Sequence, residues 1–426
     1  MRLAADHLCV DLGSPYRTCS SKMLKYISGM VILCLTIYVA LSFLPDDKKP
    51  ADERITFVGS LFTGAEQYEF FNRLKTVFPT RTIKAGPSPH RFPVGKAMTL
   101  PDSYAYEGEN YEMAQFLDDT RTVALLVIQD GEIRYEDYWL TGGVDVNWMS
   151  MSVAKSFVSA LIGIAIDEQL ITGVEAPITI YVPELLGSAY DGVRIKDVLQ
   201  MSSGARWNED YSDPNSDIMR YGAVMATGSS FDDFTASLER EKPPGTYNYY
   251  NSTDTQALGM LLARATGMSM SQYAQIKLWG PLGMEHDAYW ITDDAGVEMA
   301  AGGLQVTARD YAKLGQLYLQ QGKWQGQQIV PESWVRDSLI ADAPHLLATA
   351  HPEFPVSYGY QWWLPVSDEG EFSAIGVYNQ FVFVNPRRNV VIVKLSANPK
   401  YGLTNDESSY RELESFEFFR SIVGQL

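Results

Sequence analysis

Two β-hairpin patterns lie near opposite ends of the sequence, and together they limit the folds open to this chain. Each pattern consists of two runs rich in β-branched, aromatic and aliphatic residues, joined by a turn that contains Asp-Gly or Pro, as in adjacent antiparallel strands. The four runs are residues 122–129 (TVALLVIQ), 132–140 (EIRYEDYWL), 380–384 (QFVFV) and 390–395 (VVIVKL). Strands from both ends of the chain are therefore available to one sheet.

The sequence between the hairpins has mostly helical periodicity. Apolar residues recur there at a spacing of three to four, which indicates helices with one buried face. The segments with this pattern are Ser156–Leu170, Gln256–Thr266, Ser271–Trp279 and Ala308–Gln321. We therefore predict an α/β (α+β) fold: an antiparallel β-sheet built from both ends of the chain, flanked by helices and carrying a helical subdomain.

An uncharged run near the N-terminus is long enough to span a membrane. Residues 26–44 contain no charged side chain, and Arg17, Lys22 and Lys25 precede them. About 20 apolar residues cross the hydrocarbon core as a helix, and basic flanks stay in the cytoplasm. We predict a single transmembrane anchor with the catalytic domain outside, periplasmic or external. A cleaved signal peptide, giving a secreted protein, is the alternative, but the run is long and no A-x-A pattern follows it.

These features divide the chain into four parts. They are a short cytoplasmic tail (1–22), a transmembrane anchor or signal segment (23–45), a linker and adaptor region (46–100) and one large domain (101–426). The adaptor is rich in Pro and Phe, and its sequence indicates no chemistry.

The charge balance argues against nucleic acid as a partner. The chain has 34 basic and 52 acidic residues, a formal net charge of −18, and such a surface repels phosphate backbones. All three cysteines precede residue 35, and the five histidines include no pair at metal-binding spacing. We therefore expect neither a metal nor an organic cofactor.

Ser152-Val153-Ala154-Lys155 is an S-x-x-K element that leads into an apolar run. A helix that begins near Ser152 would bring Lys155, one turn later, beside the serine hydroxyl. Burial and the positive end of the helix dipole both disfavour the ammonium form, so the lysine pKa should fall and the amine could accept the serine proton. The alternative is an N-cap serine with a surface lysine.

A tyrosine-rich segment supplies a second candidate for proton transfer. Tyr247, Tyr249 and Tyr250 follow a Pro-Pro-Gly turn, and Asn251 comes next. A phenol beside a lysine ionises more easily, because the positive charge favours phenolate. Spacing alone does not choose among the three tyrosines, and an aromatic core cluster would give the same pattern.

Five blocks of sequence, in order, resemble the class C β-lactamase-related (penicillin-binding-protein-like) serine hydrolases, particularly the 6-aminohexanoate-oligomer hydrolase and esterase branch. The blocks are SMSVAKSF, IKDVLQMSSGARW, PPGTYNYYNSTDTQALG, AAGGLQVTARDYAKLGQLYL and YGYQWW. The resemblance covers roughly residues 100–424. It implies that Ser152 is the acylated nucleophile and Lys155 its partner. It also implies that Tyr249, in a Y-x-N element, is the general base and acid, and that Asn251 contacts the substrate.

A third family element, normally Lys-Thr-Gly or His-Thr-Gly, aligns with Ala374-Ile375-Gly376. The resemblance implies that Gly376 lets the substrate approach the backbone and that the N–H groups of Val377 and Ser152 bind the oxyanion. The family's cationic residue is replaced by Ala374. Small uncharged esters or amides are therefore the expected substrates, rather than penicillins.

The leading hypothesis is hydrolysis through a Ser152 ester. A catalytically inactive protein of the same fold, which binds envelope ligands or another protein, is the alternative. Retention of Ser152, Lys155, Tyr249 and Asn251 together argues against it. A Ser-His-Asp esterase on another fold is disfavoured, because no G-x-S-x-G elbow is present.

Overall fold

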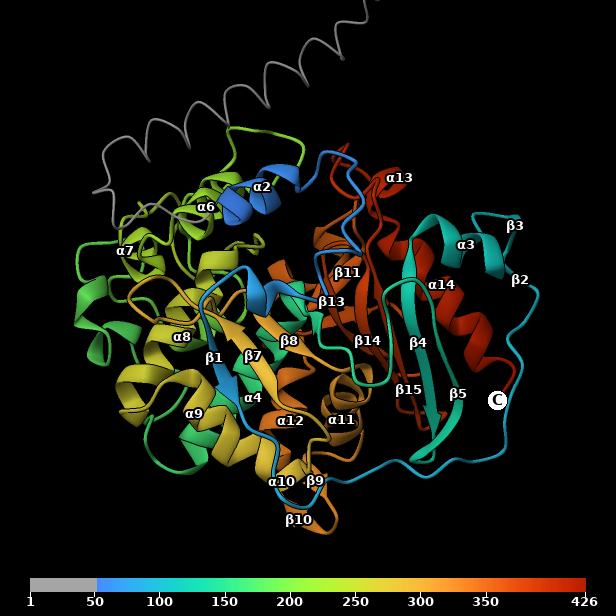
Figure 1. Ribbon diagram of the computed structural model, residues 1–426. Coiled ribbons are helices and arrows are strands. Elements are labelled where there is room, and N and C mark those ends of the chain that lie inside the picture. Colours follow the sequence, from blue (N-terminus) through green and yellow to red (C-terminus); the bar gives the residue numbers. More distant parts are fainter. Residues whose placement is uncertain (1–51) are drawn as a thin grey trace, which may run out of the picture.

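The computed structural model describes residues 52–426 (Figure 1). The predicted tail, the predicted membrane segment 23–45 and the first part of the linker lie outside the described residues. From residue 52 onward, no helix combines the length and the apolar character that a membrane crossing needs.

A seven-stranded antiparallel sheet forms the centre of the molecule, in the order β11-β12-β13-β14-β15-β4-β5. Its strands are β4 (Thr122–Gln129), β5 (Glu132–Tyr138), β11 (Val356–Tyr358), β12 (Trp363–Pro365), β13 (Phe372–Gly376), β14 (Gln380–Asn385) and β15 (Val390–Ser396). The N-terminal hairpin joins the C-terminal hairpin through the β15–β4 pair, in which Val390 lies opposite Gln129. The predicted sheet from both ends of the chain is confirmed.

Alternate residues of the central strands enter two separate cores, as the two-residue period of a strand requires. Phe381 and Phe383 pack against the C-terminal helix α14 (Glu412–Val423). Val382 and Val384, which point the other way, belong to the larger core beneath the remaining helices. Both faces of the sheet are therefore covered (Figure 1), and β14 and β15 are buried along their whole length, Lys394 included.

A second, four-stranded sheet has the order β1-β7-β8-β6 and was not predicted. It contains β1 (Thr80–Ile83), β6 (Trp148–Met149), β7 (Ala288–Ile291) and β8 (Leu304–Val306). Because β1 pairs with β7, part of the region predicted to be an adaptor is an integral component of the fold. Strand β6 ends three residues before Ser152, so this sheet holds the backbone that leads into the nucleophile turn.

Besides α14, further helices pack around the two sheets. They are α2 (Asp52–Ser60), α3 (Met113–Asp119), α4 (Ala154–Asp167), α5 (Ile195–Leu199), α6 (Asp217–Thr227), α7 (Phe231–Ala236), α8 (Ser252–Thr266), α9 (Met270–Ala274), α10 (Gly280–Leu282), α11 (Ala308–Leu319), α12 (Glu332–Ser338) and α13 (Glu407–Tyr410). Most of them form the helical part on the left of Figure 1, whereas α3 and α13 lie on the right near α14. Small pairs of strands are β2 (Ser103–Tyr106) with β3 (Glu109–Glu112) and β9 (Lys323–Trp324) with β10 (Gln327–Gln328).

The predicted helical segments correspond to helices, with one difference. The segment 271–279 begins as α9 but continues as a π-helical turn, Gln275–Trp279, before α10. Helix α4 is buried on nearly every side, which explains why its sequence is apolar all round rather than amphipathic.

Candidate active site

Ser152 lies in a single 3₁₀ turn, Met151–Val153, between β6 and α4. Met151 has a φ of +44°, a left-handed conformation that is unusual for a residue with a long side chain. Two glycines make room for this bend: a Cβ on Gly302 would lie 3.4 Å from the Met151 carbonyl carbon, and one on Gly376 would lie 3.0 Å from Met151 Cβ. The nucleophile is therefore presented by a bent backbone that its neighbours hold in place.

Lys155 is buried one turn beyond Ser152, as the S-x-x-K spacing predicts. Its Nζ lies 2.8 Å from Ser152 Oγ, 2.8 Å from the Ala301 carbonyl oxygen and 3.2 Å from Ser252 Oγ. Burial lowers the pKa of Lys155 from 10.5 to about 8, and the carboxylate of Glu209 acts in the opposite direction. The lysine is therefore close to the point at which it can give up a proton near neutral pH.

Tyr250, and not Tyr249, is the tyrosine that lies beside this pair. The Nζ of Lys155 is 5.1 Å from the centroid of the Tyr250 ring, and the phenol interacts with the Ser152 hydroxyl. Tyr249 is 43 % exposed and stacks beside Tyr247, with ring centroids 6.2 Å apart. It lines a pocket of about 230 Å³ together with Tyr247 and Asn251.

Asn251 also faces away from the nucleophile. It caps α8, where its side-chain oxygen accepts the Thr253 N–H at 2.9 Å and its Nδ2 donates to Asp254 at 3.0 Å. Its backbone is extended, with φ −137° and ψ 108°, so neighbouring residues point to opposite sides. Ser252 consequently points toward Lys155 together with Tyr250. The pattern that meets the nucleophile is Tyr250-Asn251-Ser252, one residue later than the predicted Y-x-N element.

Glu209 is a residue of the site that the sequence analysis missed. Its carboxylate accepts the Ser252 hydroxyl at 2.7 Å, the Ser252 N–H at 3.1 Å and the Tyr211 hydroxyl at 2.7 Å. The indole N–H of Trp207 donates to the same carboxylate. Glu209 comes two residues after the matched block that ends in Ala-Arg-Trp, so only its proximity to that block pointed to it.

Gly376 ends β13 directly against the nucleophile, as the sequence predicts. A Cβ there would lie 2.6 Å from the Ser150 carbonyl oxygen and 2.9 Å from the Ser152 nitrogen, so only glycine fits without a shift of backbone. Val377 follows and begins the turn to β14. Val377 directly follows the residue that lies against the Ser152 nitrogen, so its N–H is a candidate second oxyanion donor.

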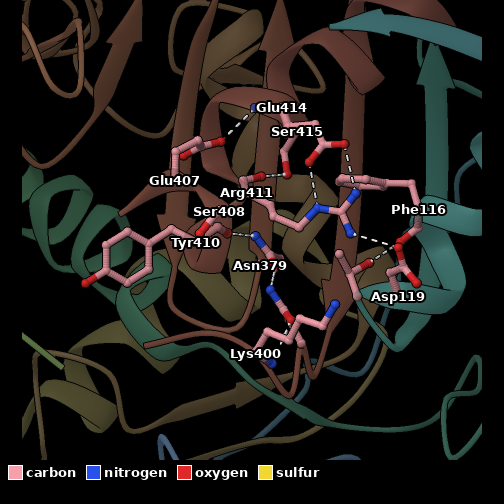
Figure 2. A network of polar contacts seen from close by, with 12 residues as sticks. Phe116, Asp119, Asn379, Lys400, Glu407, Ser408, Tyr410, Arg411, Glu414 and Ser415 are labelled. Carbon is pink, nitrogen blue, oxygen red and sulfur yellow. Dashed lines mark hydrogen bonds and ion pairs between the residues drawn. The ribbon is translucent and has the colours of Figure 1, made fainter. Parts of the chain in front are cut away.

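The turn after Val377 is held rigidly. Tyr378 and Asn379 both have a φ of +65°. Asn379 is buried, donates to the Tyr410 carbonyl oxygen at 2.7 Å and accepts from Asn398 at 2.9 Å. Figure 2 shows this amide joined to a polar network that continues through Arg411. The network fixes a turn whose left-handed residues would otherwise be unfavourable.

Among residues 52–426, no group of three or more His, Cys, Asp or Glu side chains lies in an arrangement that could hold a metal ion. Ala374, in the place of the family's cationic residue, is buried in β13 opposite Val382.

Known proteins show the same architecture. Residues 112–413 match the β-lactamase family. The 6-aminohexanoate-dimer hydrolase of Paenarthrobacter ureafaciens is 32% identical over 346 residues, which cover 77% of this chain and 85% of that enzyme. A Bacillus anthracis protein assigned as a 6-aminohexanoate-dimer hydrolase has a TM-score of 0.74 and 25% identity, over 83% of this chain and 92% of that one. A class C β-lactamase, at 16% identity and a TM-score of 0.53 over 73% and 94%, shares the fold. The chain is thus a serine hydrolase that belongs to the β-lactamase family and is related to 6-aminohexanoate-dimer hydrolase.

Proposed function

We propose that Ser152 attacks an ester or amide carbonyl and forms an acyl-enzyme that water then hydrolyses. The observation that carries this proposal is the 2.8 Å contact between Ser152 Oγ and the buried Nζ of Lys155. A serine hydroxyl is a weak nucleophile unless an adjacent base removes its proton, and a lysine with a pKa of about 8 is such a base.

Lys155 and Tyr250 divide the proton transfers between them. Burial and the charge of Glu209 raise the pKa of Tyr250 well above 10, so its phenol is neutral in the resting enzyme. The lysine is the group that deprotonates first, and in its neutral form it can accept the Ser152 proton. Tyr250 is then placed to pass its proton to the departing oxygen or nitrogen, and the Lys155 ammonium returns a proton to the phenolate, so that both groups regain their resting states. Tyr250 takes the role that the sequence assigned to Tyr249.

Backbone N–H groups stabilise the charge that develops on the carbonyl oxygen. The donors are those of Ser152 and Val377, and Gly376 permits their close approach. Because the Ser152 N–H belongs to the turn that begins a helix, it also benefits from the positive end of α4. Ser252 takes the position beside the substrate that the sequence assigned to Asn251.

The charges around the site favour substrates without a carboxylate next to the scissile bond. Ala374 offers no cation, while the carboxylate of Glu209 acts on Tyr250. Such a site repels an anionic group and accepts neutral acyl chains. Linear amides and short esters are therefore the proposed substrates, in keeping with a relative named for the dimer of 6-aminohexanoate.

A fluorophosphonate probe tests the proposal against the alternative of an inactive binding protein. The probe reacts with activated serines, so intact-mass measurement should show one adduct on the wild type and none on Ser152→Ala. Loss of one hydroxyl at a helix start costs at most ~2 kcal/mol, so Ser152→Ala should remain folded. An adduct on folded Ser152→Ala, or none on the wild type, would contradict the proposal.

We also propose that the chain is anchored in a membrane through residues 23–45, with the hydrolase domain outside the cytoplasm. The uncharged run and its upstream basic residues support this topology. Membrane fractionation with added protease would test it. Recovery of a mature chain that begins near Asp46 would instead establish a cleaved signal peptide.

A further inference from the structure

The segment that follows α2 reaches the active site although it precedes the region matched by the family, residues 112–413. Phe62 is its point of contact. The Phe62 ring lies between two tyrosines, with centroids 4.6 Å from Tyr211 and 5.2 Å from Tyr378. The Phe62 N–H also donates to the Tyr378 hydroxyl at 2.7 Å. One residue therefore touches two side chains that come from distant parts of the chain.

Tyr211 connects Phe62 to the residues proposed to transfer protons. Its hydroxyl donates to Glu209 at 2.7 Å, and Glu209 accepts the Ser252 hydroxyl at the same distance. Ser252 Oγ lies 3.2 Å from the Nζ of Lys155. Displacement of the Tyr211 ring would thus move a carboxylate whose charge raises the pKa of Lys155.

Tyr378 connects Phe62 to the turn that contains the proposed oxyanion donor. It directly follows Val377, and its φ of +65° belongs to the turn that places the Val377 N–H. Its ring is buried between Phe62 and Phe71, whose centroid is 5.1 Å away. The hydrogen bond from Phe62 fixes the other end of the side chain.

The conformation of Phe62 is itself held by its surroundings. Its φ is +59°, which is rare for an aromatic residue and persists only where the structure imposes it. Gly402 packs against the ring: a Cβ there would lie 2.7 Å from Phe62 Cδ1 and 2.9 Å from Tyr211 Cβ. On the N-terminal side, the buried Gln67 donates to the carbonyl and hydroxyl oxygens of Ser60, each at 3.0 Å.

We infer that Phe62 is a positioning residue for acylation. It holds the Tyr378 turn on one side of Ser152 and the Tyr211–Glu209 pair on the other in fixed relative positions. The N-terminal segment is then part of the catalytic unit rather than a spacer. The inference rests on the proposed function, since it needs Lys155 as the base and Val377 as an oxyanion donor. A misplacement of about 1 Å at such a site lowers the rate by about 10²-fold.

The test compares Phe62→Ala with Phe70→Ala in the full chain. Phe70 is a matched control: it is also partly buried, belongs to the same segment and packs on Phe57, at 5.6 Å. For Phe62→Ala we expect kcat on a short aryl ester to fall at least tenfold with KM nearly unchanged. We also expect the pH midpoint of kcat/KM to fall, because the Glu209 carboxylate no longer supports the ammonium form of Lys155. Phe70→Ala should change thermal stability alone.

Phe62→Leu provides a second variant if Phe62→Ala does not fold, since leucine retains apolar bulk but not ring stacking. It should show the same two changes to a smaller extent. Wild-type kcat and pH midpoint in a folded Phe62 variant would overturn the inference, as would equal changes in Phe70→Ala. Absence of a fluorophosphonate adduct on the wild type would instead contradict the proposed function itself.

Discussion

Tyr250 stacks face to face on Trp363, with ring centroids 5.3 Å apart and planes inclined by 22°. Tyr358, on the strand next to that of Trp363, packs edge-on against both rings. These contacts remove the phenol ring from water, which is why its pKa rises. They also fix the plane of the ring beside Lys155, so the hydroxyl has one position relative to Ser152.

The two neighbouring tyrosines should therefore differ sharply as Phe variants. Tyr250→Phe removes the proton relay, and because acid–base assistance is typically worth ~10²–10⁴-fold, kcat should fall by that order. Tyr249→Phe is the matched control, because its side chain is partly exposed and stacks beside Tyr247, and its kcat should stay within about threefold of the wild type, the scatter expected of a surface change. Steady-state kinetics on one aryl ester measure both. A larger loss for Tyr249→Phe would return the catalytic role to that residue.

Activity should depend on the ionisation of Lys155. Its pKa is lowered to about 8, and the neutral amine is the reactive form, so kcat/KM should rise with pH below that value and level off above it. Glu209→Gln should move the midpoint to lower pH, since Glu209 favours the ammonium form. Rates measured from pH 5 to 10 with a substrate that does not ionise test both statements. A profile that falls as pH rises through 8 would exclude Lys155 as the base.

Lys155 should also affect stability in a definite direction. Its pKa is lower in the folded than in the unfolded chain, so between about 8 and 10.5 the unfolded chain binds more protons. This group therefore makes the free energy of unfolding rise with pH across that window. Lys155→Met should make the free energy of unfolding depend less on pH, and the same variant should lose turnover. Denaturant titrations at pH 7.5 and 10 measure the difference, and an unchanged slope would show that burial does not perturb the lysine.

Gly376→Ala should impair catalysis more than stability. The new methyl group would meet the Ser150 carbonyl oxygen at 2.6 Å and displace the Ser152 N–H, and loss of one oxyanion donor costs about 10²–10³-fold in kcat. Overpacking of this kind costs ~1–3 kcal/mol in stability. Gly86→Ala, where the nearest atom would be 3.6 Å away, is the control and should retain activity. Equal activity in both variants would place the oxyanion site elsewhere.

Substrate preference follows from Ala374 and the nearby carboxylate of Glu209. Short aryl esters and linear amides should have higher kcat/KM than penicillins or D-Ala-D-Ala peptides, whose carboxylates find no cation. Initial rates on such a panel, with Ser152→Ala as the blank, measure this preference. Penicillin hydrolysis at a rate comparable with ester cleavage would contradict it.

Local sequence patterns predicted the central strands and the Ser152–Lys155 pair because each depends on short-range periodicity. Val127 and Val393 belong to strands whose sequences are apolar over several consecutive positions, a pattern that can be read without knowledge of the fold. Lys155 lies one turn from Ser152 by helix geometry alone, so its 2.8 Å contact needed no knowledge of distant residues.

The choice of tyrosine and the role of Glu209 depended on long-range structure instead. Tyr249 and Tyr250 have nearly the same local sequence, and which one points inward is decided by the extended backbone before α8 and by stacking on Trp363 of β12. Glu209 becomes part of the site only through the loop that places it on Ser252. Phe62 gave no signal either, because an aromatic residue in an irregular segment is compatible with ordinary core packing.

The pairing of β15 with β4 has a consequence for biosynthesis. The hydroxyls of Thr122 and Ser396 lie 3.3 Å apart, although 274 positions separate them in the chain. Such non-local pairing forms slowly, and a nascent polypeptide must wait for its last portion before this pairing can close. Until then β4 presents an unpaired edge that invites association with other chains. A protein truncated before residue 390 should therefore aggregate or be degraded, and chaperone protection during synthesis matters more here than for a fold of local contacts.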